Sequence, residues 1–437
     1  MSNNTNQNSN FLVVGLNPAF QKRLLLSKNA SNQHSNNLIP GNVHRIDQVL
    51  EGIGGKGQDV AVSLSILGIC PDLLQFVGAG DGNGDHLMQL LREKLTIDDG
   101  KEKNHHHETT KSNYDPGRLT IRTKSKLRTC TTIVGSDNAT ELVEPSGLVE
   151  PNELQELTQL IDSVQNINAL CIMGSMPPGC PEDTYAQIIA SVMRDNSNAL
   201  CVIDSVVGLK FMLNQLAALE GARDRAVLKV NVSELCKLAS LKSDDSKGDT
   251  PTSNNKRDMI SAAVDGFVKA FGGMEHVARA IQCILLTDGK DPGYVVQLKL
   301  VEDDVDGTLR PYQIYQMDAI DLSNHADILF PIGAGDAVAA GTLAAWDYIR
   351  RVEQGPLHDK ESSHEVAASD VMLHKDVQQC LSLRRRDFGM KTTDDQISDI
   401  VRAFAFGIAC GSASCLVEEN SEFRLADVLR LFREMMR

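Results

Sequence analysis

Short apolar runs alternate with amphipathic helical patterns along most of this 437-residue sequence, and this alternation constrains the fold most strongly. The runs are apolar almost without interruption, which is typical of parallel strands buried on both faces. We expect strands at Phe11–Leu16, Leu73–Val77, Ala169–Met173, Leu200–Asp204, Ala226–Val230 and Ile281–Thr287. We expect helices at Gln58–Leu67, Glu153–Ser163, Glu182–Met193, Val206–Leu219, Ser233–Leu241, Met259–Phe271, Asp336–Ile349, Ile397–Ser412 and Arg424–Met436. The pattern predicts one α/β domain with a mainly parallel central sheet and helices on both faces.

Three segments depart from this pattern, because their polar and apolar residues alternate with a period of two. They are Arg23–Leu26, Asn42–Val49 and Leu119–Val134. Such alternation is typical of half-exposed strands, so we expect a small second sheet from segments at about 20–50 and 119–135. Polar stretches at about 98–117, 243–257 and 351–398 are interpreted as insertions, residues 1–10 as a flexible tail, and 11–437 as a single domain.

The charge balance argues against several classes of function. The chain has 43 basic and 58 acidic residues, a formal net charge of −15, which disfavours binding to nucleic acid or to an anionic membrane. No apolar run reaches the roughly 18 residues that span a bilayer, and the amino end lacks the features of a signal peptide. We therefore expect a soluble, cytoplasmic protein with no nucleic-acid or membrane partner.

Cysteine and histidine offer little support for a metal or disulfide framework. The ten cysteines are scattered and form no CxxC pair, so we expect reduced thiols. The triplet His105-His106-His107 could bind a metal, but its polar surroundings favour a solvated insertion.

The strongest local signal is Gly333-Ala334-Gly335-Asp336, which precedes an Ala- and Gly-rich helical pattern. Small residues at the start of a helix allow backbone N–H groups to approach an anion. Asp336 could cap this helix, or it could take a proton from a hydroxyl that attacks a bound phosphate. The short pattern alone leaves both interpretations open.

Weaker signals lie at three other positions. Gly52–Gly57, with Lys56 inside it, is either an anion-binding approach to a helix or a structural turn. Thr287 and Gly289 follow an apolar strand, where parallel sheets bind ligands. Asn231 and Glu234, after Lys229, could hold a hydrated Mg²⁺ ion or merely cap a helix.

Six motifs in this order resemble those of the ribokinase-like PfkB carbohydrate kinases, in particular the branch of 1-phosphofructokinase and tagatose-6-phosphate kinase. The resemblance extends from Phe11 to about Val417, with interruptions at the insertions. The motifs are Leu16–Ala19, Gly54–Gly57, Gly174–Gly179, Asn231-x-x-Glu234, Gly333–Asp336 and Gly407–Ser414. The resemblance implies a ribokinase-like α/β fold with a small β-sheet lid, ATP and Mg²⁺ as cofactors, a sugar or sugar phosphate as substrate, and a homodimer as one arrangement of subunits.

The resemblance also assigns expected roles to single residues. Asp336 would be the catalytic base, and the amides of Gly333, Ala334 and Gly335 would form an anion hole. Substrate binding would involve Asn17, Gln21, Gly55, Lys56, Asp59 and Arg128. ATP binding would involve Lys229, Asn231, Thr287, Gly289, Gly333, Gly335 and Gly411, and Glu234 would hold Mg²⁺ through water.

Several positions depart from the family pattern. Gln21 replaces an aspartate that holds sugar hydroxyls, Asp59 replaces an asparagine, and Cys130 stands where the lid motif has asparagine. Lys56 and Arg128 are retained, and two cations favour an acceptor that already carries phosphate. Arg128 could instead be one of several solvated cations along its strand.

Three hypotheses follow from these observations. The first is an ATP-dependent kinase for a phosphorylated ketohexose, similar to 1-phosphofructokinase. The second is a catalytically weak protein that binds sugar phosphate or nucleotide in a regulatory role. The third, a nucleotide-sugar oxidoreductase, is disfavoured because no GxGxxG motif follows the first strand.

Overall fold

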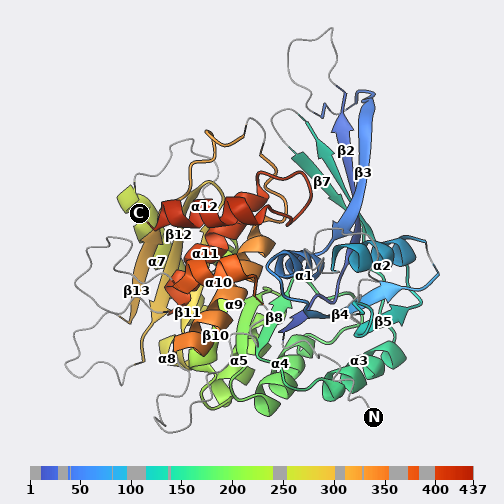
Figure 1. Cartoon of the computed structure of the whole chain (residues 1–437). Coiled ribbons are helices and arrows are strands. Elements are labelled where there is room, and N and C mark those ends of the chain that lie inside the picture. Colours follow the sequence, from blue (N-terminus) through green and yellow to red (C-terminus); the bar gives the residue numbers. More distant parts are fainter. Residues whose placement is uncertain are drawn as a thin grey trace, which may run out of the picture.

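The predicted parallel strands lie side by side in one large sheet, as a computed structural model of the chain shows (Figure 1). The structure describes residues 11–27, 38–39, 41–80, 82–95, 115–135, 139–239, 253–300, 311–326, 329–353, 373–382 and 399–436. Nine strands form the large sheet, in the order β13 (Tyr312–Met317), β12 (Asp291–Leu298), β11 (Cys283–Asp288), β10 (Ala226–Asn231), β9 (Leu200–Asp204), β8 (Ala169–Met173), β1 (Phe11–Val14), β4 (Asp72–Gly78) and β5 (Thr120–Thr123). All neighbours from β5 to β11 pair in parallel, which confirms the predicted sheet.

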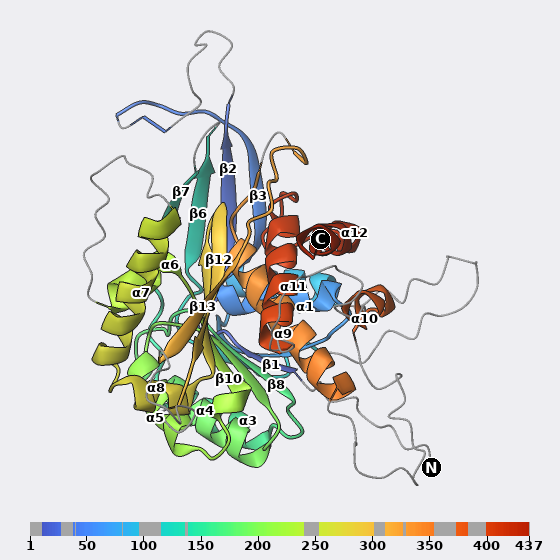
Figure 2. The same ribbon diagram turned by 90° about the vertical axis from the view of Figure 1, so that its left-hand side faces the viewer.

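Helices cover both faces of this sheet (Figure 2). One face is covered by α1 (Lys56–Ile66), α2 (Asn83–Lys94), α9 (Ala334–Glu353), α10 (Lys375–Ser382), α11 (Asp399–Ser414) and α12 (Leu425–Met435). The other is covered by α3 (Pro151–Ser163), α4 (Thr184–Asp195), α5 (Leu209–Ala218), α6 (Val232–Leu238), α7 (Ser253–Ala270) and α8 (Met274–Ala280). Successive strand residues therefore alternate between two hydrophobic cores, as Leu12 and Val13 do, and this explains why the strands are apolar throughout.

A small sheet projects from the body of the molecule (Figures 1 and 2). Its strand order is β3 (Ile46–Gly54), β2 (Ala19–Leu26), β6 (Thr129–Val134) and β7 (Ala139–Val143). The central pair β2–β6 is parallel, and the two outer pairs are antiparallel. The sequence predicted this sheet from segments distant in the chain, although it did not predict β7.

One boundary of the predicted small sheet is wrong. The segment 119–135 was expected to lie wholly in it, but β5, at the start of this segment, pairs with β4 of the large sheet. Ile121 and Thr123 are buried there, so the alternation that indicated a half-exposed strand comes from its position at the edge of the large sheet.

The strand β12 and the edge strand β13 were also missed. They continue the sheet in antiparallel fashion beyond β11. A two-residue turn joins β11 to β12, and its first residue, Gly289, adopts φ +60°, a left-handed conformation that favours glycine. The Asp288-Gly289 pair is therefore a hairpin signal, whereas the sequence led us to expect only a ligand position there.

The predicted insertions are only partly described. Helix α10 lies within the stretch 351–398, helix α9 extends to Glu353, and helix α7 begins at Ser253 inside the stretch 243–257. The predicted tail 1–10, the triplet His105–His107 and most of these stretches fall outside the described residues. All ten cysteines are free thiols, and eight of them are buried. In the described part of the chain, no helix is long and apolar enough to cross a membrane.

Candidate active site

A cleft of about 460 Å³ lies between the carboxyl edge of the large sheet and the small sheet. Its walls come from loops after β1, β8 and β9, from the first turns of α1, α6 and α9, and from the inner side of the small sheet. The predicted site residues that line it are Asn17, Gln21, Gly55, Lys56, Asp59, Arg128, Glu234, Gly333 and Asp336. The structure therefore brings together every residue predicted to bind the substrate.

Glycines allow two helices to begin at this cleft. At the start of α1, a Cβ on Gly57 would collide with the backbone of Gly15 in the loop after β1. At the start of α9, Gly333 has φ +81°, and a Cβ there would collide with Ser421. Both glycines are thus needed for the close approach of backbone segments around the cleft.

Ser421 ties the two helix starts together. Its hydroxyl donates a hydrogen bond of 2.9 Å to the carbonyl of Gly333, and its own carbonyl accepts one of 2.7 Å from the hydroxyl of Ser63 in α1. The segment after α11 therefore fixes the Gly333 turn against α1.

Asp204, the last residue of β9, bridges two lysines. Its Oδ1 is 2.7 Å from Nζ of Lys56 in α1, and its Oδ2 is 2.5 Å from Nζ of Lys229 on β10. Burial alone would raise the pKa of Asp204, but the two ammonium groups outweigh it and hold the pKa below its ordinary value. Burial likewise acts to lower the pKa of Lys56, but nearby carboxylates, Asp204 first, raise it overall. Both shifts favour the charged forms of Asp204 and Lys56.

Asp336 is the third residue of α9, not its N-cap. The interpretation of Asp336 as the N-cap is therefore wrong, because the helix begins at Ala334 and Gly333 is the residue that precedes it. The side chain is only 8% exposed and lines the cleft. Burial and the nearby Asp204 raise its pKa to about 7, against the lowering effect of Lys56 and Lys229. A carboxylate with such a pKa can accept a proton near neutral pH.

Lys229 also lies beside the glycine turn. A Cβ built on Gly335 would be 3.1 Å from the ammonium nitrogen of Lys229. The turn therefore combines the amino end of the long helix α9 with a buried cation, an arrangement that suits a phosphate group.

Asn231 and Glu234 form a capping box at the start of α6. The Asn231 side-chain oxygen accepts a hydrogen bond of 2.7 Å from the Glu234 amide, and Oε2 of Glu234 accepts one of 2.9 Å from the Asn231 amide. The structure thus supports the capping interpretation of this pair. The other oxygen of Glu234, Oε1, lies 3.9 Å from Nζ of Lys56 in the cleft.

The described residues contain no group of three or more His, Cys, Asp or Glu side chains that could hold a metal ion by themselves. Glu234 could contribute one carboxylate oxygen. This fits Mg²⁺ in sites where one or two carboxylates, water and substrate phosphates share the ion.

Two other residues predicted to bind the substrate already donate hydrogen bonds to side chains of the protein. Nε2 of Gln21 donates to the hydroxyl of Thr132 at 2.7 Å, and Nδ2 of Asn17 donates to the hydroxyl of Ser175 at 2.9 Å. Asp59 is the exception within this group, because its Oδ1 is buried without a hydrogen-bond partner among the described residues.

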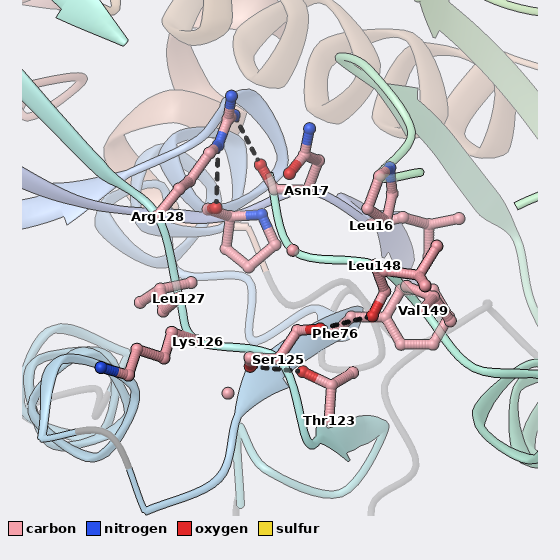
Figure 3. Close-up of a pocket in the computed structure, with 14 residues that line it drawn as sticks. Leu16, Asn17, Phe76, Thr123, Ser125, Lys126, Leu127, Arg128, Leu148 and Val149 are labelled. Atoms are coloured by element: carbon pink, nitrogen blue, oxygen red, sulfur yellow. Dashed lines mark hydrogen bonds between the residues drawn. The ribbon is translucent and has the colours of Figure 1, made fainter. Parts of the chain in front are cut away.

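Arg128 holds the loop after β1. Its guanidinium donates hydrogen bonds to the carbonyls of Asn17, at 2.9 Å, and Pro18, at 3.3 Å (Figure 3). Arg128 and Asn17 also line a second pocket of about 20 Å³, which has room for about one water molecule. Arg128 is half-buried, whereas Lys124 and Lys126 on the same segment are exposed, so it is not one of a row of solvated cations.

Of the seven residues expected to bind ATP, only Gly333 lines the cleft. Lys229, Asn231 and Gly335 lie beside it, as described above, and the other three are Thr287, Gly289 and Gly411. Thr287 pairs with Asn231 across β10 and β11, and Gly289 lies in the turn that follows. Gly411 packs against α9, where a Cβ would be 2.7 Å from the carbonyl oxygen of Ala334. The close packing of α11 against α9 therefore explains why a glycine stands at position 411.

Sequence reasoning missed several cleft residues, above all Asp204 and Glu141. Asp204 ends an otherwise apolar strand at the carboxyl edge of a parallel sheet, and a buried acid at that position was a usable signal. Glu141 lies on β7, which was not predicted.

Comparison with known proteins agrees with this architecture. A model of the pfkB family of carbohydrate kinases matches residues 116–359, more than half of the chain. Phosphofructokinase-2 from Escherichia coli, solved with substrates and products, is 15% identical with a TM-score of 0.60, over 98% of this chain and 99% of that one. A possible 1-phosphofructokinase from Thermotoga maritima is 14% identical with a TM-score of 0.52, over 97% of both chains. Ribokinase from Giardia lamblia is 12% identical with a TM-score of 0.58, over 96% of this chain and 98% of that one. At these identities the structures establish a ribokinase-like fold.

Proposed function

Because the chain belongs to the pfkB family of carbohydrate kinases, we propose that it transfers the γ-phosphoryl group of ATP to a hydroxyl of a sugar. The observation that carries this proposal is the environment of Asp336. Its buried carboxylate, with a pKa of about 7, lies in the cleft at the start of α9, close to the half-exposed Lys56 and the buried Lys229.

The reaction would place the acceptor hydroxyl against the carboxylate of Asp336. The carboxylate takes the hydroxyl proton as the oxygen attacks the γ-phosphorus. Negative charge on the transferring group is received by the amides of the Gly333–Gly335 turn and by the ammonium group of Lys229. Bound Mg²⁺ supplies further neutralisation of the phosphates, and Glu234 would hold it through water.

Asp204 would keep both lysines in place. Its two oxygens fix Lys56 and Lys229 on either side, so that their charges stay beside Asp336 when the cleft is empty. Without them, burial would raise the pKa of Asp336 further and reduce the fraction of active base at neutral pH.

Two classes of acceptor have to be compared. A phosphorylated ketohexose is the candidate from sequence, and the positions of Lys56 and Arg128 in the cleft support it. An unphosphorylated sugar is the other. In the structure Lys56 is paired with Asp204, and Arg128 is bound to main-chain carbonyls, so a phosphate would have to displace these contacts.

The test is ADP release with MgATP and a panel of sugars and sugar phosphates, for wild type and Asp336→Asn. Asp162→Asn, which changes an exposed acid on α3, serves as the control. We expect release that depends on an acceptor, is lost in Asp336→Asn and is kept in the control. A rise in melting temperature with MgATP, without turnover of any acceptor, would favour the regulatory hypothesis instead.

A homodimer is a further proposal. The small sheet exposes the apolar side chains of Ile46, Val49 and Leu142, which supports pairing of two such sheets. Sedimentation of the purified chain, compared with a Val49→Glu, Leu142→Glu double variant, tests it. A monomeric wild type would reject this proposal. The predicted cytoplasmic location stays a prediction.

A further inference from the structure

A buried tyrosine lies behind the wall of the cleft, under the loop that follows β8. Tyr185, the second residue of α4, is fully buried in the core between the large sheet and the helices α3 to α8. Its hydroxyl is within hydrogen-bond distance of three successive main-chain carbonyls, at 3.1 Å from Met173, 3.4 Å from Gly174 and 3.1 Å from Ser175. A hydroxyl has a single proton, so the three carbonyls share one donor. The start of this loop therefore converges on the Tyr185 hydroxyl.

The same hydroxyl also faces the loop after β1. Burial raises the pKa of Tyr185 above its ordinary value, and the backbone of Leu16 acts in the opposite direction. On the cleft side, Nδ2 of Asn17 donates to the hydroxyl of Ser175 at 2.9 Å. The strands β1 and β8 are neighbours in the sheet, and the loops that follow them are thus joined both in the core and in the cleft.

The loop after β8 also supports the lysine of the cleft. Gly174 has φ +72°, and a Cβ there would be 3.4 Å from Cβ of Lys56, so the main chain of this glycine lies against the stem of the lysine. The amide of Gly174 donates to the carbonyl of Asp204 at 2.9 Å. Gly174 is therefore held through its amide by the end of β9 and through its carbonyl by Tyr185.

The hydroxyl of Tyr185 is not needed to fill the core. Phenylalanine would occupy nearly the same volume, and a polar atom in an apolar core costs free energy unless it is hydrogen-bonded. Tyr185 does not line the cleft, whereas the three residues whose carbonyls surround its hydroxyl all do. The hydroxyl thus affects the cleft through the position of this loop.

We infer that Tyr185 is a positioning residue for the acceptor, because its buried hydroxyl holds the loop after β8 against the loop after β1 and so keeps Asn17 and Lys56 in place. This inference rests on the proposed kinase function and adds a residue that does not touch the substrate. The base Asp336 and the cation Lys229 come from other elements, α9 and β10. The affinity for the acceptor should therefore depend on Tyr185, and the transfer step should not.

Tyr185→Phe removes only the hydroxyl oxygen. The matched control is Tyr348→Phe on α9, which also removes a buried hydroxyl, one that is 2.8 Å from the hydroxyl of Ser382 on α10. We expect similar decreases in melting temperature for both variants. For the acceptor with the highest turnover, KM of Tyr185→Phe should rise at least about fivefold, while kcat and KM for MgATP stay within about twofold of wild type. The control should keep all three values within about twofold.

Two further measurements keep the test independent of a folding defect and of the acceptor. Ser175→Ala removes the contact with Asn17 from an exposed position, and it should also raise KM for the acceptor. Hydrogen exchange, measured by mass spectrometry on the protein without ligands, reports on the loops directly. We expect faster exchange in peptides that cover 15–18 and 174–180 in Tyr185→Phe, and unchanged exchange there in Tyr348→Phe.

An unchanged acceptor KM in Tyr185→Phe would overturn the inference, and so would an equal rise of KM in Tyr348→Phe. If Tyr185→Phe does not fold, an unchanged acceptor KM in Ser175→Ala has the same meaning. Failure of the kinase proposal looks different, because no acceptor then supports ADP release by wild type. Hydrogen exchange decides in that case. Faster exchange confined to the two loops supports the positioning role of Tyr185, and exchange equal to wild type refutes it.

Discussion

Replacing Asp336 with asparagine is expected to abolish phosphoryl transfer and to stabilise the folded protein above pH 7. The carboxyl has an ordinary pKa of 3.8 and a pKa of about 7 in the folded state. Between these two values the folded protein holds a proton that the unfolded chain releases. The free energy of unfolding of wild type therefore falls as pH rises from about 4 to about 7, and it stays low above this range.

The size of this fall follows from the difference between the two pKa values. At about 1.4 kcal/mol per unit, roughly three units correspond to an upper limit of about 4 kcal/mol. Asparagine does not titrate, so this decrease in the free energy of unfolding with rising pH is absent in the variant. The attraction between the ionised Asp336 and the two lysines, Lys56 and Lys229, is already contained in the pKa of about 7, because both lysines lower it.

Urea denaturation of both proteins at pH 5, 6, 7 and 8 measures the effect. We expect the variant to gain stability relative to wild type as pH rises, by about 2–3 kcal/mol between pH 5 and pH 8. ADP release at pH 8 should fall by about 10²–10⁴. A stability difference that is constant over this pH range would refute the raised pKa. Turnover within about threefold of wild type would refute the role of general base.

Three further substitutions test the packing around the cleft. Asp204→Asn should cost about 3–5 kcal/mol of unfolding free energy, because Lys229 keeps its buried charge and loses its partner, and a urea midpoint equal to wild type would contradict the bridge. Gly411→Ala should cost about 1–3 kcal/mol by crowding α9, whereas Gly52→Ala, which has open space around it, should be close to neutral in the same denaturation experiment. Asn231→Ala should cost about 0.5–2 kcal/mol through loss of the capping box, and Asn231→Asp should recover most of it, as measured by melting temperature.

The central sheet could be predicted from sequence because its strands are buried on both faces. Ala169–Met173 and Leu200–Asp204 were predicted with the bounds that the structure has. Edge strands carry a weaker signal, since one side of them faces solvent or a loop. For this reason β13 was missed, and β5 was assigned to the wrong sheet.

The residues of the candidate site could be identified, but their partners could not. Lys56 and Asp204 are 148 residues apart, and their contact depends on how a helix start meets the end of a strand. Nothing local in the sequence distinguishes a lysine that is free to bind phosphate from one that is paired with a buried acid. Arg128 presents the same difficulty, because its partners are main-chain carbonyls, which every residue possesses.

The hydrogen bonds of Ser421 have a consequence for biosynthesis. They complete the turn at Gly333 and link it to α1, so the cleft needs a residue that follows every strand of the large sheet in the chain. A ribosome therefore releases that residue after these strands have emerged. Until then α9 lacks the helix α11 that packs against it, and its apolar face stays open to solvent or to a chaperone. Ligands that need the complete cleft can therefore bind only after Ser421 has emerged, and the nascent chain has to remain protected from aggregation until then.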